Sequence, residues 1–492
     1  TLSSIVLYSL SFPPFSIWPL MWGGLAPFFI AVVTVRPASA AVLGVLWGAG
    51  MFYGVFWCFP WMLANYFNLS FLLGWIGLFA VGLVFSGMFY GAFAFWLSWL
   101  SGHNAANPLV VAAGWGVCEF ARVHFFISNP WALSGYSQVA LTQVMQIADA
   151  TGPYGIGMLL AAVNVCLAGA LTPTLRAKRF SLSIVGVIVV LGGAFMYGKW
   201  RLSQTFTSPK PFKVAIVQAA IDYSARFDLE RQTANFERYR ALTLQAAQAQ
   251  PTIIFWPEYA VNFHLQEETP ERDRLIHLSR EVKADLIVGG PHYEYGAKEL
   301  IQHNSVFLIH NGRLAGRYDK MRLLPLAEAN HFGGFVANGL SNYKPGKHIR
   351  SLRTERARVG VFLCFEAMFP DLVRRFARQG AEVLANPSND DWLEFAAPAR
   401  QQLDVARVRA IENRRYLIRP TPTGFSAVID PYGRVISFGG FGDPAVLVAS
   451  VAPLRVRTLY QQWGDMTSWI AVTLVATASL LQLKNWKLKD YN

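Results

Sequence analysis

Charged residues are scarce in this chain of 492 residues: Asp, Glu, Lys and Arg make up 15% of it, and hydrophobic residues 53%. A soluble protein carries about 25% charged residues. The scarcity is uneven, because residues 1–199 hold few charges while residues 212–457 have the composition of an ordinary soluble domain. The first region contains several apolar runs of the about 20 residues that a bilayer crossing needs. We therefore predict a polytopic membrane region joined to a soluble domain.

Cysteines and metal-binding motifs are also few. The 4 cysteines are too dispersed for a disulfide framework, and Cys58, Cys118 and Cys166 lie in apolar segments as small hydrophobic side chains. Cys364 is the only cysteine in the soluble region and should be a free thiol. The 9 histidines form neither an HExxH motif nor a cluster with cysteine, so we expect no metal and no cofactor.

The net charge of +13 raises the question of nucleic-acid binding. The basic residues are scattered through the soluble half, without a helix rich in Arg and Lys and without interleaved aromatic residues. Attraction to anionic lipid headgroups explains the charge better, and we expect no nucleic-acid partner.

About eight membrane spans are expected. Seven lie in a membrane domain over residues 1–199, where the first is the remnant of a span whose start is missing. A soluble domain over 212–457 follows, and a C-terminal transmembrane helix over 467–483 ends the series. The first seven spans are predicted at 3–12, 17–35, 40–64, 70–100, 107–127, 152–172 and 180–198.

The positions of basic residues predict the orientation. One side of the membrane carries Arg36, the loop 176–179 and the tail 484–489. We predict that this side is cytoplasmic, because basic residues are enriched in cytoplasmic loops. The soluble region falls on the other side, which is the periplasm if the cell is Gram-negative. The membrane is then the inner (cytoplasmic) membrane. Lys199 and Arg201 are exceptions, because they flank the seventh span on the outer side.

Glu119 and Arg122 are spaced i, i+3 near the outer end of the fifth span and share a helix face. One interpretation is a pair that reaches toward the surface at the helix end. The other is a polar contact to a lipid headgroup.

Strands alternate with helices in the soluble half, which indicates an α/β domain. Three reactive side chains follow predicted strands. The apolar run 359–366 contains Cys364, the run 253–257 precedes Glu258, and Lys320 follows the strand 304–310. We expect these side chains to meet at one site at the strand ends.

A thiol needs a base or a cation nearby, because little of it is ionised at neutral pH. Glu258 could remove the thiol proton of Cys364, and Lys320 could stabilise the oxyanion that forms when the sulfur attacks a carbonyl. The three residue types together indicate acyl transfer through a thioester.

The motifs 256–258 (Trp-Pro-Glu), 318–320 (Tyr-Asp-Lys) and 364–366 (Cys-Phe-Glu) resemble the triad motifs of the nitrilase (carbon–nitrogen hydrolase) superfamily. In the membrane region, residues 12–19 and 129–138 are similar to the bacterial apolipoprotein N-acyltransferase family. The resemblance implies an α-β-β-α sandwich as the second part of the fold, after the α-helical membrane domain.

The resemblance also implies roles for single residues. Glu258 is then the general base, Lys320 stabilises the tetrahedral intermediate, and Cys364 is the nucleophile. Supporting roles fall to Glu328 and Glu366, and substrate-lining positions to Asn304, Phe365 and Trp392. The implied reaction moves an acyl chain from a phospholipid to Cys364 and then to the α-amine of a diacylglyceryl apolipoprotein, in a monomeric enzyme.

Several departures from the family pattern leave alternatives open. Phe365 replaces a tyrosine, Gln401-Gln402 replaces Gln-His, and the segment after Lys320 is altered. The alternatives are a membrane-tethered amidase or nitrilase-type hydrolase, an N-acyltransferase with another amine acceptor, and a catalytically inactive membrane scaffold. The glycine-rich segment 326–343 is either a mobile lid or an ordinary surface loop.

Overall fold

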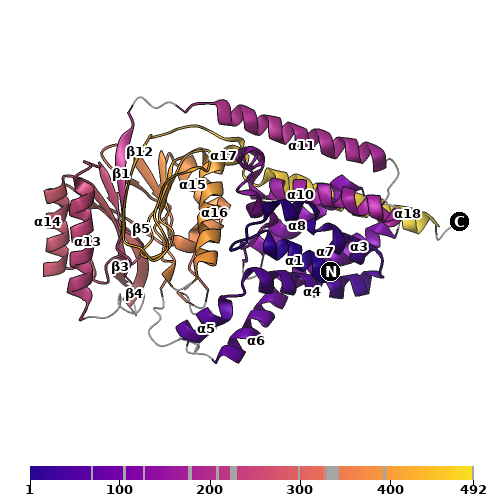
Figure 1. The fold of residues 1–492 in the computed structure, drawn as a ribbon, viewed down its shortest axis with the longest axis horizontal. Helices are drawn as coiled ribbons and strands as arrows, with labels where there is room; N and C mark the ends of the chain where they lie inside the picture. Colours follow the sequence, from indigo (N-terminus) through magenta and orange to yellow (C-terminus); the bar gives the residue numbers. More distant parts are fainter. Residues whose placement is uncertain are drawn as a thin grey trace. The chain divides into compact units, whose positions relative to one another are not determined.

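The computed structural model describes residues 1–67, 70–102, 107–125, 128–175, 180–206, 210–221, 230–296, 300–325, 327–328, 343–391 and 395–489. The chain forms two compact units (Figure 1). The helical unit comprises Thr1–Ala64, Leu69–Gln204 and Trp463–Asn492, and the sheet unit comprises Asn65–Asn68 and Thr205–Gln462.

Apolar helices make up the helical unit. They are α1 (Leu2–Leu10), α2 (Met21–Gly24), α3 (Ala26–Val33), α4 (Pro37–Val55), α5 (Phe59–Phe67), α6 (Phe71–Gly82), α7 (Met88–Ser101), α8 (Pro108–His124), α9 (Thr142–Met145), α10 (Ala148–Leu171), α11 (Phe180–Ser203) and α18 (Met466–Lys489). A π-helical turn over Leu83–Gly87 joins α6 to α7.

Five helical segments among the described residues are long and apolar enough to cross a membrane: Pro37–Val55, Phe71–Ser101, Ala148–Leu171, Phe180–Ser203 and Met466–Lys484. The stretch Trp18–Val33 is apolar but shorter. These segments make the chain a membrane protein, while the number of eight spans stays a prediction. The span predicted at 40–64 is wrong at its end, because α4 stops at Val55 and a separate helix, α5, starts at Phe59.

Glu119 and Arg122 on α8 are both fully buried, so neither interpretation that places them at the lipid surface is correct. The Ser134 N–H donates to Glu119 Oε1 at 2.7 Å. Arg122 Nη2 donates to the Ala132 carbonyl at 3.3 Å, and its guanidinium lies 5.7 Å from the centre of the Tyr90 ring. The pair therefore fixes the segment after α8 from inside the helical unit.

Two six-stranded sheets form the centre of the sheet unit, in the orders β12-β1-β2-β3-β4-β5 and β11-β10-β9-β8-β7-β6. The strands are β1 (Phe212–Gln218), β2 (Ile253–Phe255), β3 (Asp285–Tyr295), β4 (Leu300–His310), β5 (Arg313–Asp319), β6 (Ser351–Arg353), β7 (Arg358–Val361), β8 (Val383–Ala385), β9 (Leu417–Arg419), β10 (Ala427–Ile429), β11 (Val435–Phe438) and β12 (Ala445–Val451). Each sheet has three parallel strands at its centre, β1–β3 in one and β7–β9 in the other.

Helices cover the outer faces of both sheets. Figure 1 shows α13 (Gln232–Ala247) and α14 (Pro270–Val282) on one side of the sheets, and α15 (Pro370–Arg378) and α16 (Ala396–Asn413) on the other. Tyr239 of α13 stacks on Trp256 at 4.7 Å between ring centres, inside an apolar core shared with the first sheet. The predicted α-β-β-α sandwich is thereby confirmed.

The first strand of the sheet unit pairs with its last strand. β1 runs antiparallel to β12, with Phe212 opposite Val451 and Gln218 opposite Ala445. The pairing makes β12 an edge strand of the first sheet. The chain then continues into the short helix α17 (Leu459–Trp463).

Candidate active site

Glu258 lies three residues after β2 and is 2% exposed. The strand beside it carries Gly289, where a Cβ atom would stand 2.3 Å from the Pro257 carbonyl oxygen and 2.7 Å from Glu258 Cα. Only a glycine permits this close approach, so β3 determines how deeply the Glu258 segment sits.

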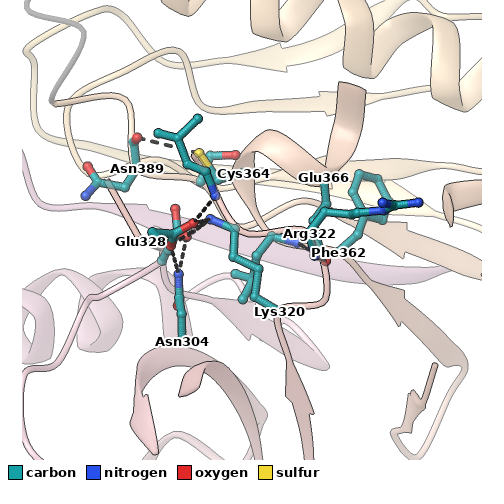
Figure 2. Close-up of polar contacts among 12 residues, drawn as sticks. Asn304, Lys320, Arg322, Glu328, Phe362, Cys364, Glu366 and Asn389 are labelled. Atoms are coloured by element: carbon teal, nitrogen blue, oxygen red, sulfur yellow. Dashed lines mark hydrogen bonds and ion pairs between the residues drawn. The ribbon is translucent and has the colours of Figure 1, made fainter. Parts of the chain in front are cut away.

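Lys320 follows β5 directly and is 2% exposed. Its N–H donates to the Asn304 carbonyl at 2.8 Å, which ties the lysine to β4. Its ammonium donates to Glu258 Oε1 and to Glu328 Oε1, each at 2.9 Å. The Asn304 side chain donates to the same two oxygens, at 2.7 and 2.6 Å. Figure 2 shows Asn304, Lys320 and Glu328 gathered at this point.

Glu328 is fixed by its own backbone neighbours, because the Leu324 N–H donates to Oε2 at 2.8 Å. The Lys320 ammonium thus donates hydrogen bonds to two buried carboxylates, those of Glu258 and Glu328. Burial raises the pKa of Glu258, with Lys320 opposing the rise. Burial alone would lower the pKa of Lys320, but Glu258 and Glu328 hold it well above its usual value. Lys320 is therefore a cation at neutral pH, beside a carboxylate that binds a proton more readily than usual.

Cys364 opens a short 3-10 helix, Cys364–Met368, with φ of 46°. This left-handed conformation is uncommon for a residue with a side chain and concentrates at functional sites. The Cys364 N–H donates to the Pro387 carbonyl at 2.9 Å, and Sγ lies 3.7 Å from the Asn389 carbonyl oxygen. Burial and the neighbouring Glu258 raise the pKa of the thiol well above its usual value. The resting sulfur is therefore a thiol and needs a base.

Glu366 joins the cysteine turn to the lysine segment. Its carboxylate accepts the N–H groups of Met321 at 2.7 Å, Arg322 at 3.0 Å and Leu363 at 2.6 Å. The Tyr318 hydroxyl donates to both of its oxygens. Burial raises the pKa of Glu366 to about 7, against the opposing effect of these N–H groups. Glu366 therefore holds the Cys364 turn and the segment after Lys320 together.

A second buried ion pair lies behind the cysteine. Arg419 Nη2 donates to both oxygens of Asp390 at 2.8 Å, and both residues are fully buried. Arg419 Nη2 also lies 3.4 Å from Gln402 Oε1, which in turn is 4.0 Å from Cys364 Sγ. Gln402 Nε2 is buried without a hydrogen-bond partner among the described residues. Sequence reasoning gave Gln402 no role, and its only signal was the departure from a Gln-His pair.

The remaining predicted residues have different outcomes. Phe365 is 7% exposed and packs edge-on against Phe369, with ring centres 5.2 Å apart. Trp392 and most of the predicted lid lie outside the described residues. The structure thus joins Glu258 and Glu328 through hydrogen bonds from Lys320 and from Asn304. Cys364 lies close enough for the charges of Glu258 and Lys320 to act on its pKa.

The chain resembles known proteins over nearly its whole length. The family model for carbon–nitrogen hydrolases matches residues 213–461, and that for the N-terminal domain of apolipoprotein N-acyltransferases matches residues 4–166. The apolipoprotein N-acyltransferase of Geobacter metallireducens is 30% identical over 97% of this chain and 94% of its own length. That of Methylococcus capsulatus is 30% identical over 94% of this chain and 92% of its own length.

Among solved structures, a nitrilase-superfamily protein of Saccharomyces cerevisiae is 21% identical, covering 53% of this chain and 97% of its own, with a TM-score of 0.41. Both family models match in chain order, the first in the helical unit and the second in the sheet unit. The chain is an acyltransferase and belongs to the apolipoprotein N-acyltransferase family, with a carbon–nitrogen hydrolase domain as its sheet unit.

Proposed function

We propose that the enzyme moves a fatty acyl chain from a membrane phospholipid to the α-amine of the diacylglyceryl-cysteine of an apolipoprotein, through a thioester on Cys364. The observation that supports this best is the buried group of Glu258, Lys320 and Glu328 beside the only thiol of residues 205–462. It provides a base, a cation and a nucleophile, which are the groups that acyl transfer needs.

In the first half-reaction, Glu258 takes the proton of the Cys364 thiol as the sulfur attacks the ester carbonyl of the lipid. The carbonyl oxygen becomes an oxyanion, and the Lys320 ammonium stabilises it. The tetrahedral intermediate then breaks its bond to the glycerol oxygen, which takes the proton from Glu258 and leaves as a lysophospholipid. The acyl chain stays on sulfur.

In the second half-reaction, the acceptor amine attacks the thioester carbonyl and loses a proton to Glu258. The carbon–sulfur bond breaks, the proton returns to sulfur, and an amide is released. Cys364 is only 3% exposed, which favours an amine that binds at the site over random attack by water.

The proposed setting is the inner membrane of a Gram-negative bacterium, with the sheet unit on the periplasmic side and the enzyme acting as a monomer. The basic residues of the predicted cytoplasmic loops support the orientation. A phospholipid donor suits a catalytic unit that is held at a bilayer by helices on both sides of it in the chain.

Intact-mass measurement of the full-length protein after incubation with phospholipid tests the proposal. The mass should rise by one acyl chain, neutral hydroxylamine should remove the addition, and Cys364→Ser should lack a hydroxylamine-labile adduct. A synthetic diacylglyceryl-cysteine peptide should then discharge the thioester faster than water does. Rapid discharge by water, without acceleration by the peptide, would show a hydrolase instead.

A further inference from the structure

An amide nitrogen beside the nucleophile is buried without a partner. The Gln402 side chain of α16 is fully buried, and its Oε1 stands 4.0 Å from Cys364 Sγ. Its Nε2 has no hydrogen-bond partner among the described residues. Burying an N–H donor in this way destabilises the folded state, because the donor gives up its bond to water. Where a native structure keeps such a group, a role in catalysis is one of the few explanations.

Arg419 determines which way the Gln402 amide is turned. A guanidinium can only donate hydrogen bonds, so the amide atom that faces Arg419 Nη2 at 3.4 Å must be the oxygen. The opposite orientation would bring two donors together. Nε2 is bonded to the same carbon as Oε1, so it points away from the guanidinium and stays near Cys364. The unpaired donor therefore has one preferred orientation beside the sulfur.

The resting structure gains little from this amide. Arg419 Nη2 is already bonded to both oxygens of Asp390 at 2.8 Å, so its longer contact with Gln402 is a weak addition. The contact between Gln402 Oε1 and Cys364 Sγ is also weak, since a thiol is a poor donor. An apolar side chain of the same length would bury no unpaired N–H here. A group that arrives during the reaction explains the amide better.

The oxyanion of the proposed acyl transfer has a use for a second donor. The Lys320 ammonium is already bonded to Glu258 and to Glu328, which leaves a single N–H for the carbonyl oxygen that becomes negatively charged. Sites that stabilise an oxyanion aim several preorganised donors at the place where the charge develops. A further N–H near the sulfur would add to the one that Lys320 has left.

We propose that Gln402 Nε2 donates a hydrogen bond to the carbonyl oxygen of the acyl group that Cys364 carries. The inference rests on the proposed thioester and names a further catalytic residue for it. The bond strengthens as the oxygen gains negative charge in the tetrahedral intermediate of each half-reaction. Lys320 follows β5 in the first sheet, whereas Gln402 lies on α16, which packs on the second sheet. The two layers of the sandwich thus supply one donor each.

Gln402→Met tests the proposal in the full-length protein, because methionine has a similar length and no N–H. The rate of acyl-enzyme formation from phospholipid, followed by intact mass in a single turnover, should fall about 10²–10³-fold, as for the loss of one oxyanion donor. The KM for phospholipid should change little, because the bond is strongest after the sulfur has attacked. The temperature of unfolding should not fall, because the variant removes an unpaired buried donor.

The matched control is Gln461→Met on α17. Gln461 is also buried, but its Nε2 donates to the Asn413 carbonyl at 2.6 Å. Its replacement should therefore lower the temperature of unfolding and leave the rate of acylation nearly unchanged. The two variants are expected to separate rate from stability in opposite ways, which a merely structural role of Gln402 would not do.

Infrared spectroscopy of the acyl-enzyme gives a second measurement. With a phospholipid that carries an isotope label at its ester carbonyl, the stretching frequency of the thioester carbonyl can be isolated in the difference spectrum. A hydrogen bond weakens the carbonyl bond, so the frequency should be higher in Gln402→Met than in the parent and in Gln461→Met.

The outcomes distinguish this inference from the proposed function. An acyl-enzyme that forms at the parent rate in Gln402→Met, with an unchanged carbonyl frequency, would overturn the role of Gln402 and leave the transferase standing. A slower rate with a lowered temperature of unfolding and an unchanged frequency would also overturn it, in favour of a structural role. A parent protein that forms no hydroxylamine-labile adduct would overturn the proposed function, and this inference with it.

Discussion

The Lys320 ammonium bridges Glu258 and Glu328, and the proposed mechanism gives these carboxylates unequal tasks. Glu258 is the proton acceptor, whereas Glu328 holds the lysine and accepts the Leu324 N–H. Replacing each glutamate in turn by glutamine, which keeps the shape and removes the charge, distinguishes these two tasks.

Glu258→Gln should slow thioester formation by about 10²–10⁴-fold, because it removes the base and keeps the shape. Glu328→Gln is the matched control and should cost less, since the base is still present. The rate of acyl-enzyme formation, followed by intact mass in a single turnover, measures both. Equal losses in the two variants would contradict the assignment of Glu258 as the base.

The pH dependence of the activity follows from the raised pKa values of Glu258 and Lys320. Glu258 works as a base only when ionised, and burial raises its pKa, so activity should rise with pH through a value above the about 4.3 of an ordinary glutamate. The pKa of Lys320 is held well above its usual value, so the lysine stays charged throughout this range. A profile of kcat/KM from pH 4 to pH 9 reports the free enzyme. An acid limb centred near pH 4 would show that the base is another group.

The positions of Glu258, Lys320 and Cys364 next to strands could be predicted from the sequence, while their catalytic roles stay predictions. Gln402 and the buried Asp390–Arg419 pair could not be placed in the same way. Arg419 ends β9 while Gln402 lies on α16, and only the folded chain brings them to Cys364.

The strand β3 packs against the segment that holds Glu258 and fixes the position of that segment. β3 accepts the turn at Pro257 and Glu258 only because residue 289 has no side chain. The atoms in the way are backbone atoms, which cannot rotate aside.

Gly289→Ala should therefore displace Glu258 and lower the rate of thioester formation at least about tenfold, with a loss of stability of about 1–3 kcal/mol from overpacking. Gly316→Ala on β5 is the control, since its nearest neighbour is the end of the Leu352 side chain at 3.1 Å, and it should leave the rate nearly unchanged. Rate and thermal unfolding are measured on both variants. Wild-type rates in Gly289→Ala would show that β3 does not position the base.

Elements with clear apolar runs were predictable, and short or mixed ones were not. The strand predicted at 253–257 contains β2 (Ile253–Phe255), and the strand predicted at 304–310 lies within β4 (Leu300–His310). The strand predicted at 359–366 is wrong at its end, because β7 stops at Val361 and the chain turns at Cys364 with a positive φ. The apolar run continues through this turn because the turn itself is buried, so hydrophobicity alone cannot mark where the strand ends.

For the whole molecule, the orientation in the membrane is the testable expectation. Reporter fusions at residue 177 and at residue 300 should report opposite sides, with residue 177 in the cytoplasm. The physical reason is the retention of Arg and Lys on the cytoplasmic side. Lys199→Gln is a useful control, because removing a basic residue from the outer side should leave the orientation unchanged. The same side for both fusions would contradict the predicted topology.

The pairing of β1 with β12 sets the order of events during synthesis. β1 is complete at Gln218, but its antiparallel partner begins at Ala445, more than 220 residues later. Ribosomes add about 5–20 residues per second, so this edge of the first sheet stays open for roughly 10–45 seconds. An exposed strand edge is a site for pairing with the wrong chain. The newly made β1 therefore has an unpaired edge for all of the time that the chain needs to reach β12.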